Sequence, residues 1–206
     1  MTQVLAADAP GWLETVARVV RRGGLVAFPT DTVYGVGASA FLVAAVDRIY
    51  RAKGRREDNP IPVLLAGSGE IDRITTKASP RVLHLAEAFW PGPLTLVLPK
   101  QGWLPDAVSR KDTVGVRVPN HPVAAGILRA AGPMAVSSAN RSGQPSLTTA
   151  SEVLEALGDN IDLLVDGGDS PGGTPSTVVD CTTSPPGLIR EGPIPLAAVL
   201  KAWALG

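Results

Sequence analysis

The sequence has little cysteine, few aromatic residues and no excess of either charge. Cys181 is the only cysteine among 206 residues, which excludes an intrachain disulfide and a cysteine-rich metal site, and favours a reducing compartment. Aromatic residues make up only 4% of the chain, so we expect a core of Val, Leu, Ile and Ala. Lys plus Arg and Asp plus Glu number 19 each, so the chain lacks the basic excess typical of proteins that coat nucleic acids.

Long hydrophobic runs are also missing. No stretch of about 18 apolar residues occurs, and the first residues contain no basic segment followed by an apolar one. We therefore expect no membrane span, no signal peptide and a cytoplasmic location. Hydrophobic residues make up 45% and charged residues 18%, which indicates a folded chain, and the length favours one compact domain over 1–206.

The apolar pattern predicts alternating helices and strands. Helices are expected at 10–22, 43–51, 80–89, 121–131 and 150–157, with a weakly helical tail over 196–204. Strands are expected at 25–28, 61–66, 94–98, 114–118, 134–137, 161–165, 176–180 and 187–190, with a loop at 29–37. Early alternation and later clustering of strands predict a three-layer α/β or α+β domain around a mixed sheet.

Polar residues cluster directly after the predicted strands, where α/β sheets place their ligand sites. The segment 29–37 reads P-T-D-T-V-Y-G-V-G and brings two hydroxyls, a carboxylate and a phenol out of one strand end. A ligand-binding loop and a turn in which Thr and Asp cap the backbone explain this segment about equally well.

Five cations lie within nine residues, and they suit a phosphate site. They are Arg48, Arg51, Lys53, Arg55 and Arg56. Charge-assisted donors bind phosphate oxygens, and the arginine fork matches their geometry. A solvated helix end is the alternative, because the helix dipole favours cations at a C-terminus.

Two further segments place polar groups beside apolar strands. Arg117 lies inside the run T-V-G-V-R-V-P at 113–119, so it should face either a ligand pocket or a carboxylate of the protein. The segment 137–146 is rich in neutral donors and acceptors, and is either a ligand loop or a capped connection. It lacks G-x-S-x-G, which argues against an acyl-enzyme at Ser138.

Several common enzyme signatures are absent. The chain has neither the P-loop pattern nor a strand-linked G-x-G-x-x-G, so the usual triphosphate and dinucleotide motifs are excluded. His84 and His121 are the only histidines and are expected to be structural. The run from Asp166 to Asp169 is expected to be a glycine-rich turn, and we predict no metal site built by the protein.

Six short motifs occur in one order along the chain. They are P-T-D-T-V-Y-G-V-G at 29–37, K-x-R at 53–55, W-P-G-P-L-T at 90–95, G-V-R-V-P at 115–119, S-A-N at 138–140 and S-T-V-V-D at 176–180. Together they resemble the YrdC/Sua5 family, the threonylcarbamoyl-AMP synthases, over about 11–195. The resemblance implies a single YrdC-like domain, with a twisted mixed parallel and antiparallel sheet, flanking helices and a large basic concave cavity. It also implies the short form of the family, in which 196–206 is a C-terminal tail.

The resemblance also implies roles for individual residues. The implied threonine-binding residues are Thr32, Arg117, Val136 and Ser176. The implied phosphate-binding, catalytic residues are Lys53, Arg55, Ser138 and Asn140. The implied ATP contacts are Arg55, Asn59, Thr113, Ser138, Ser146 and Arg190.

The activity implied is the synthesis of threonylcarbamoyl-AMP and pyrophosphate from L-threonine, bicarbonate and ATP, with Mg²⁺ entering on ATP. The product would pass to a tRNA threonylcarbamoyltransferase that makes N6-threonylcarbamoyladenosine, and direct tRNA contact is not required. Two alternatives stay open: an RNA-binding module of the same fold, and a carbamoyl-adenylating domain like that of hydrogenase-maturation carbamoyltransferases.

Overall fold

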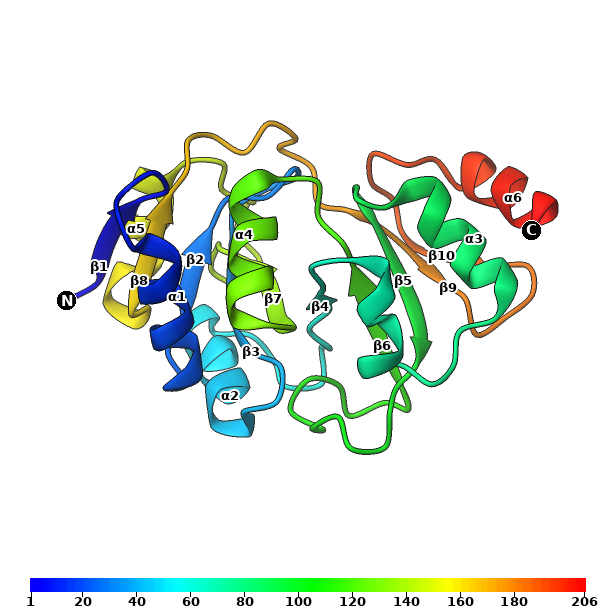
Figure 1. The fold of residues 1–206 in the computed structure, drawn as a ribbon, viewed down its shortest axis with the longest axis horizontal. Helices are drawn as coiled ribbons and strands as arrows, with labels where there is room; N and C mark the ends of the chain where they lie inside the picture. Colours follow the sequence, from blue (N-terminus) through cyan, green and yellow to red (C-terminus); the bar gives the residue numbers. More distant parts are fainter.

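The computed structural model describes all residues, 1–206, around one sheet with the strand order β1-β8-β2-β3-β7-β4-β6-β5-β9-β10 (Figure 1). The strands are β1 (Gln3–Ala6), β2 (Val26–Phe28), β3 (Gly35–Ser39), β4 (Val63–Leu64), β5 (Leu94–Pro99), β6 (Thr113–Arg117), β7 (Met134–Ser138), β8 (Leu163–Asp166), β9 (Thr177–Asp180) and β10 (Gly187–Arg190). The α-helices are α1 (Trp12–Arg21), α2 (Val43–Lys53), α3 (Pro80–Phe89), α4 (Pro122–Ala131), α5 (Ala150–Leu157) and α6 (Leu196–Leu205), with 3₁₀ turns η1 (Ser68–Arg73) and η2 (Gly158–Asn160).

The sheet is mixed, as the sequence predicted. Parallel pairs join β1 to β8, β2 to β8, β4 to β6 and β5 to β9. The remaining neighbours are antiparallel. Figure 1 shows α1 packed beside α4, and α3 packed beside α6 near the C-terminus. None of the helices has the length and hydrophobicity that a membrane crossing requires.

The helix ends carry recognisable capping signals. The Ser79 hydroxyl accepts a hydrogen bond from the Val82 amide and starts α3, with Pro80 in the first turn as expected. Thr149 and Glu152 form a capping box at the start of α5. Gly54 has φ 60° and ends α2, so the chain turns directly after Lys53.

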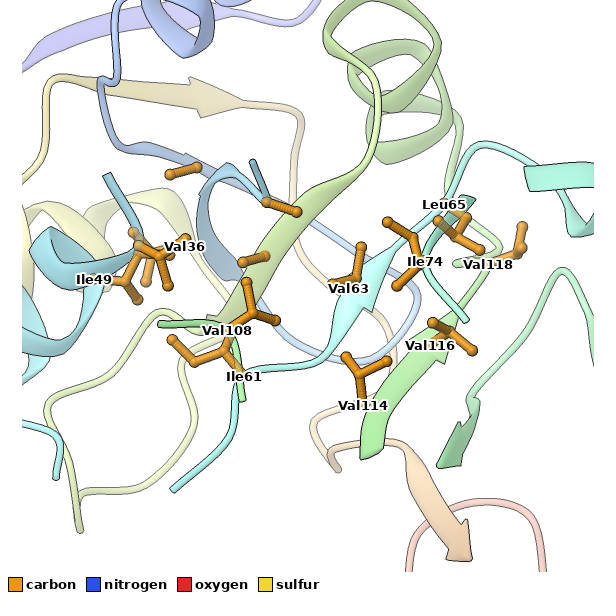
Figure 2. Close-up of a cluster of buried hydrophobic side chains, with 14 of the residues drawn as sticks. Val36, Ile49, Ile61, Val63, Leu65, Ile74, Val108, Val114, Val116 and Val118 are labelled. Atoms are coloured by element: carbon orange, nitrogen blue, oxygen red, sulfur yellow. The ribbon is translucent and has the colours of Figure 1, made fainter. Parts of the chain in front are cut away.

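Two aliphatic cores lie on opposite faces of the sheet. A cluster of 12 residues packs α1 and α4 on β2, β7 and β8, and a cluster of 37 residues packs the remaining helices. Along β2, Val26 and Phe28 belong to the smaller cluster and Ala27 to the larger, as the alternation of strand side chains requires. Figure 2 shows branched side chains of the larger cluster along β4 and β6, including Val63 and Val116. The aliphatic core expected from the composition is confirmed.

The same alternation opens a cavity on one half of the sheet. On β5, β6 and β9, one set of side chains is buried in the larger core: Leu94, Leu96, Leu98, Val114, Val116 and Val179. The intervening set faces the other way and lines the cavity: Thr95, Val97, Thr113, Gly115, Arg117, Val178 and Asp180. The strand pattern therefore gives this part of the sheet one face that is buried in the apolar core and one face that lines the cavity.

The structure corrects four parts of the sequence prediction. No element was expected before residue 10, but β1 pairs with β8 there; it is a short, largely exposed edge strand without an apolar alternation. The 3₁₀ turn η1 was not predicted either. The tail is a full helix, α6, because Val199 and Trp203 pack into the larger core.

The fourth correction concerns 29–37, which was predicted to be a loop throughout. Gly35–Ser39 forms β3, paired with β2 and β7. Glycine normally disfavours strands, but here it permits close packing. A Cβ on Gly35 or on Gly37 would lie 2.7 Å from a methyl group of Val136, so only glycine lets β7 approach. The prediction failed because this close approach is a tertiary requirement.

Candidate active site

A cavity of about 750 Å³ lies over β4, β5, β6, β7 and β9. Its size falls within the range usual for small-molecule sites, roughly 300–1,000 Å³. Nine of the predicted site residues line it: Thr32, Arg55, Asn59, Thr113, Arg117, Val136, Ser138, Ser176 and Arg190. Lys53, Asn140 and Ser146 are not part of the lining. The structure thus brings segments that are distant in sequence to one hollow.

The lining is rich in cations and hydroxyl groups. Arg55, Lys111, Arg117 and Arg190 supply positive charge, and Asp180 is the one carboxylate. Such a set suits an anionic ligand, because several charge-assisted donors converge where water is partly excluded.

The loop between β2 and β3 is organised by a single hydroxyl. Thr30 Oγ1 donates to the Val33 carbonyl at 2.7 Å and accepts from the amides of Thr32 and Val33. The loop is therefore a capped turn, yet Thr32 and Tyr34 also line the cavity. The capped turn is therefore confirmed, and the same segment lies on the cavity wall, where a ligand-binding loop would lie. The turn is what directs the Thr32 side chain into the hollow.

The loop 167–175 packs against this turn and holds it in place. The Gly173 amide donates to the Thr32 carbonyl at 2.8 Å, and Ser170 Oγ accepts from the Thr30 amide at 3.3 Å. The Tyr34 hydroxyl donates to the Gly168 carbonyl at 2.8 Å, and burial raises its pKa to about 12. Tyr34 therefore acts as a neutral anchor between the two loops.

Arg117 lies in the cavity wall and is also paired with the protein. Its Nη2 donates to Asp31 Oδ1 at 2.5 Å, its Nη1 to Thr32 Oγ1 at 3.1 Å and its Nε to the Gly92 carbonyl at 3.0 Å. Burial lowers the Arg117 pKa and Asp31 opposes that shift. Both predicted environments are therefore present. Of five N–H donors three are used, so one on each terminal nitrogen is left for a ligand.

Lys53 lies behind the residues that line the cavity and is not one of them. Its side chain is buried, and its Nζ donates to the backbone carbonyls of Ser138 and Asn140. Burial, with a smaller contribution from Arg55, lowers the Lys53 pKa to about 8. Lys53 therefore fixes the end of β7, from which the Ser138 side chain enters the cavity.

Asn140 also supports the wall from behind. Its Nδ2 donates to the carbonyls of Arg141 and Gln144 at 2.8 and 2.6 Å, closing the turn after β7. Its Oδ1 is buried without a partner. Ser146 follows this turn, half-buried and outside the lining.

Two arginines of the cavity lining are close enough for their charges to interact. Arg55 is held by the carbonyls of Asn59 and Pro60, at 3.1 and 3.0 Å. Arg190 is held by Ser176, at 2.7 Å from Nη2 to the carbonyl oxygen and 3.1 Å to Oγ. Burial lowers the pKa of both groups, and the charge of Arg55 lowers that of Arg190 further, so an anion near both groups would relieve their repulsion.

Sequence reasoning missed several residues of the lining. Lys111 and Asp180 add charge, and Thr95 adds a hydroxyl. Thr95 and Asp180 stood inside quoted motifs, and their place on the cavity side follows from strand alternation. Lys111 belongs to a loop for which no local pattern was available.

The other polar groups considered form no metal site. No group of three or more His, Cys, Asp and Glu side chains is arranged to hold a metal ion. Asp166 accepts a hydrogen bond from the Gly168 amide within the glycine-rich turn expected there. Burial raises the Cys181 pKa to about 12, so this thiol is protonated and unreactive.

Fold and cavity together define a class of protein: a mixed-sheet α/β domain whose open sheet face carries a cationic, hydroxyl-rich hollow for small molecules. The family model for Sua5, YciO and YrdC proteins, described as telomere recombination, matches residues 18–192. The chain therefore belongs to the Sua5/YciO/YrdC family.

Named relatives agree with this membership. The chain is 43% identical over 191 residues to the threonylcarbamoyl-AMP synthase of Pyrococcus abyssi, covering 92% of this chain and 56% of that protein. It is 42% identical over 200 residues to the Bacillus subtilis threonylcarbamoyl-AMP synthase, covering 94% and 57%. The crystal structure of P. abyssi Sua5 complexed with L-threonine superposes with a TM-score of 0.92 at 40% identity, over 98% of this chain and 60% of that one. This chain thus spans little more than half the length of these relatives.

Proposed function

We propose that this chain is an L-threonylcarbamoyladenylate synthase, a nucleotidyltransferase that joins L-threonine, bicarbonate and ATP. One observation carries the proposal: cations and hydroxyls from six separate motifs meet in one cavity of about 750 Å³. The names of the relatives, and the threonine bound to P. abyssi Sua5, support the same reading.

Threonine would bind at the Arg117 end of the cavity. Each terminal nitrogen of Arg117 keeps one N–H donor, and the carboxylate of threonine would accept from both. Thr32 holds Nη1 at 3.1 Å and so keeps the fork in place. Val136 and Ser176 lie on the same lining.

The triphosphate would lie between Arg55 and Arg190, with the Ser138 hydroxyl at the third side. An anion there relieves the repulsion between the two guanidinium groups. Asn59 and Thr113 line the same cavity and would contact the same nucleotide. Lys53 and Asn140 would act by holding the end of β7, and Ser146 lies outside this arrangement.

The reaction proposed has two steps. The threonine amine attacks the bicarbonate carbon with loss of water, giving N-carboxy-threonine. A carbamate oxygen then attacks the α-phosphorus of ATP in line, and the bond to the β-phosphate oxygen breaks to release pyrophosphate. Such a transfer needs positioning and charge stabilisation more than a protein nucleophile, which matches the residues present.

Magnesium fits this cavity as a partner of the nucleotide. Mg²⁺ is usually held by substrate phosphates, waters and one or two carboxylates, and Asp180 is the carboxylate available. When bound, the ion would supply positive charge to the phosphates. The product would pass to a tRNA threonylcarbamoyltransferase, and the cytoplasm remains the predicted location.

The test is radiolabelled bicarbonate incorporation with ATP and Mg²⁺. We expect a labelled adenylate and equimolar pyrophosphate with L-threonine. Pyrophosphate release that needs carbamoyl phosphate in place of threonine and bicarbonate would identify a carbamoyl-adenylating domain. Salt-sensitive RNA binding without threonine-dependent cleavage would identify an RNA-binding module.

A further inference from the structure

Ser176 forms two hydrogen bonds to neighbouring side chains. These bonds determine whether its hydroxyl can donate to a ligand or accept from one. Its Oγ lies 2.8 Å from Thr95 Oγ1 and 3.1 Å from Arg190 Nη2. Thr95 and Ser176 are both buried, with 2% and 5% of their surface exposed, and both line the cavity. Neither hydroxyl can rely on bulk water for a partner.

The donors and acceptors can be counted. A hydroxyl group has one proton to donate and two lone pairs that accept. Arg190 is a cation and can only donate, so it occupies one lone pair of Ser176. The Thr95 and Ser176 hydroxyls share one hydrogen bond, in which either oxygen can be the donor. When Thr95 is the donor, both lone pairs of Ser176 are used, and the proton of Ser176 is left for the cavity.

We propose that Thr95 is a positioning residue that, with Arg190, presets Ser176 as a hydrogen-bond donor to the side-chain hydroxyl of bound threonine. The inference rests on the proposed function, because it takes threonine to be the ligand. Thr95 acts through Ser176 and selects for an acceptor oxygen at that point. An amino acid without the hydroxyl leaves the Ser176 proton unpaired, which costs binding free energy.

The spacing of the strands supports this assignment. β5 lies between β6 and β9 in the sheet, so Arg117 and Ser176 come from segments two strand spacings apart, about 10 Å between backbones. A threonine whose carboxylate lies on the Arg117 fork can direct its side-chain hydroxyl toward Ser176. Gly115 leaves room beside Thr95, since a Cβ there would lie 3.0 Å from Thr95 Cγ2.

The experiment compares L-threonine with L-2-aminobutyrate, which has hydrogen in place of the hydroxyl. The readout is the ratio of kcat/KM for the two amino acids. Thr95→Val keeps the side-chain shape and removes the hydroxyl; we expect the ratio to fall roughly tenfold, mainly through the threonine KM, with the ATP KM within about twofold. Thr95→Ser keeps the hydroxyl and should retain the ratio. Thermal unfolding checks that each variant is folded.

A double-mutant cycle separates action through Ser176 from direct contact. In the Ser176→Ala background, Thr95→Val should cause no further loss of discrimination. An unchanged ratio in Thr95→Val, or an equal further loss in the Ser176→Ala background, overturns the inference. Wild-type protein with no threonine- and bicarbonate-dependent pyrophosphate release would instead overturn the proposed function.

Discussion

Asp31 and Arg117 form a buried ion pair, with 11% and 7% of their side chains exposed. Only one carboxylate oxygen takes part: Oδ1 lies 2.5 Å from Arg117 Nη2, while Oδ2 is buried without a partner. The neighbouring Nδ1 of His121 is also buried and unpartnered, and Asp31 opposes the lowering of the His121 pKa by burial. Asp31 therefore holds Arg117 in the cavity wall, although the desolvation of its second carboxylate oxygen is not offset by a hydrogen bond.

Removing Asp31 should destabilise the fold. Breaking a buried ion pair leaves the other charge uncompensated, so Asp31→Ala should lower the free energy of unfolding by about 3–5 kcal/mol. Arg117→Met should cause a loss of the same order, and the double variant should lose much less than the sum. Urea unfolding of the four proteins measures the coupling. The exposed Arg56–Asp58 pair is the control, with an expected coupling below about 1 kcal/mol. Full additivity at Asp31 and Arg117 would contradict the pairing.

Lysine cannot replace Arg117 in carboxylate binding. A single ammonium group has no planar fork, so Arg117→Lys should raise the threonine KM by at least about tenfold while the ATP KM changes little. Steady-state pyrophosphate release measures both constants. Arg129→Lys, at an exposed position of α4, should match wild type. Equal increases in both KM values would place Arg117 outside the threonine site.

Two adjacent arginines offer a matched test of the phosphate site. Arg55 lines the cavity, whereas Arg56 projects into solvent with 85% of its side chain exposed. Arg55→Ala should lower kcat by about 100-fold or more, because a cation that stabilises transition-state charge is lost. Arg56→Ala should stay within about twofold of wild type. Similar effects of the two substitutions would mean a general charge effect instead of a specific contact.

Lys53 should leave a signature in the pH dependence of stability. Its folded-state pKa is about 8, below the usual value near 10.5, so the unfolded chain binds more protons between these pH values. Stability linked to Lys53 therefore rises as pH increases from about 8 to 10.5, as the cost of burying the charge disappears. Lys53→Met lacks this contribution. The difference in unfolding free energy between wild type and Lys53→Met, followed by urea unfolding from pH 7 to 10.5, should change in that window. A constant difference would show that the lysine keeps its ordinary pKa.

Much of the fold could be predicted because periodicity is a local property. Helices α1 to α5 and the core strands follow from apolar spacing, capping residues and glycines. The strands that the prediction missed are β1 and β3. Strand β1 is an exposed edge strand with little apolar signal. Strand β3 contains two glycines, which are required because Val136 approaches closely.

The candidate site, like the fold, could be predicted only in part. The resemblance carried by the six motifs pointed to Thr32, Arg55, Arg117, Ser138 and Ser176, and all five line one cavity. Their individual contacts could not be predicted from local patterns.

By itself, the sequence determined most of the helices and core strands, which strand face is apolar, and that polar groups gather at strand ends, because these depend on neighbours a few positions away. Only the tertiary structure decided that Arg117 meets Asp31, 86 positions distant, and that Lys53 reaches the carbonyl of Ser138 from behind the wall. Such pairings depend on which strands become neighbours in the sheet. They form because buried charges and polar groups need partners within the packed structure.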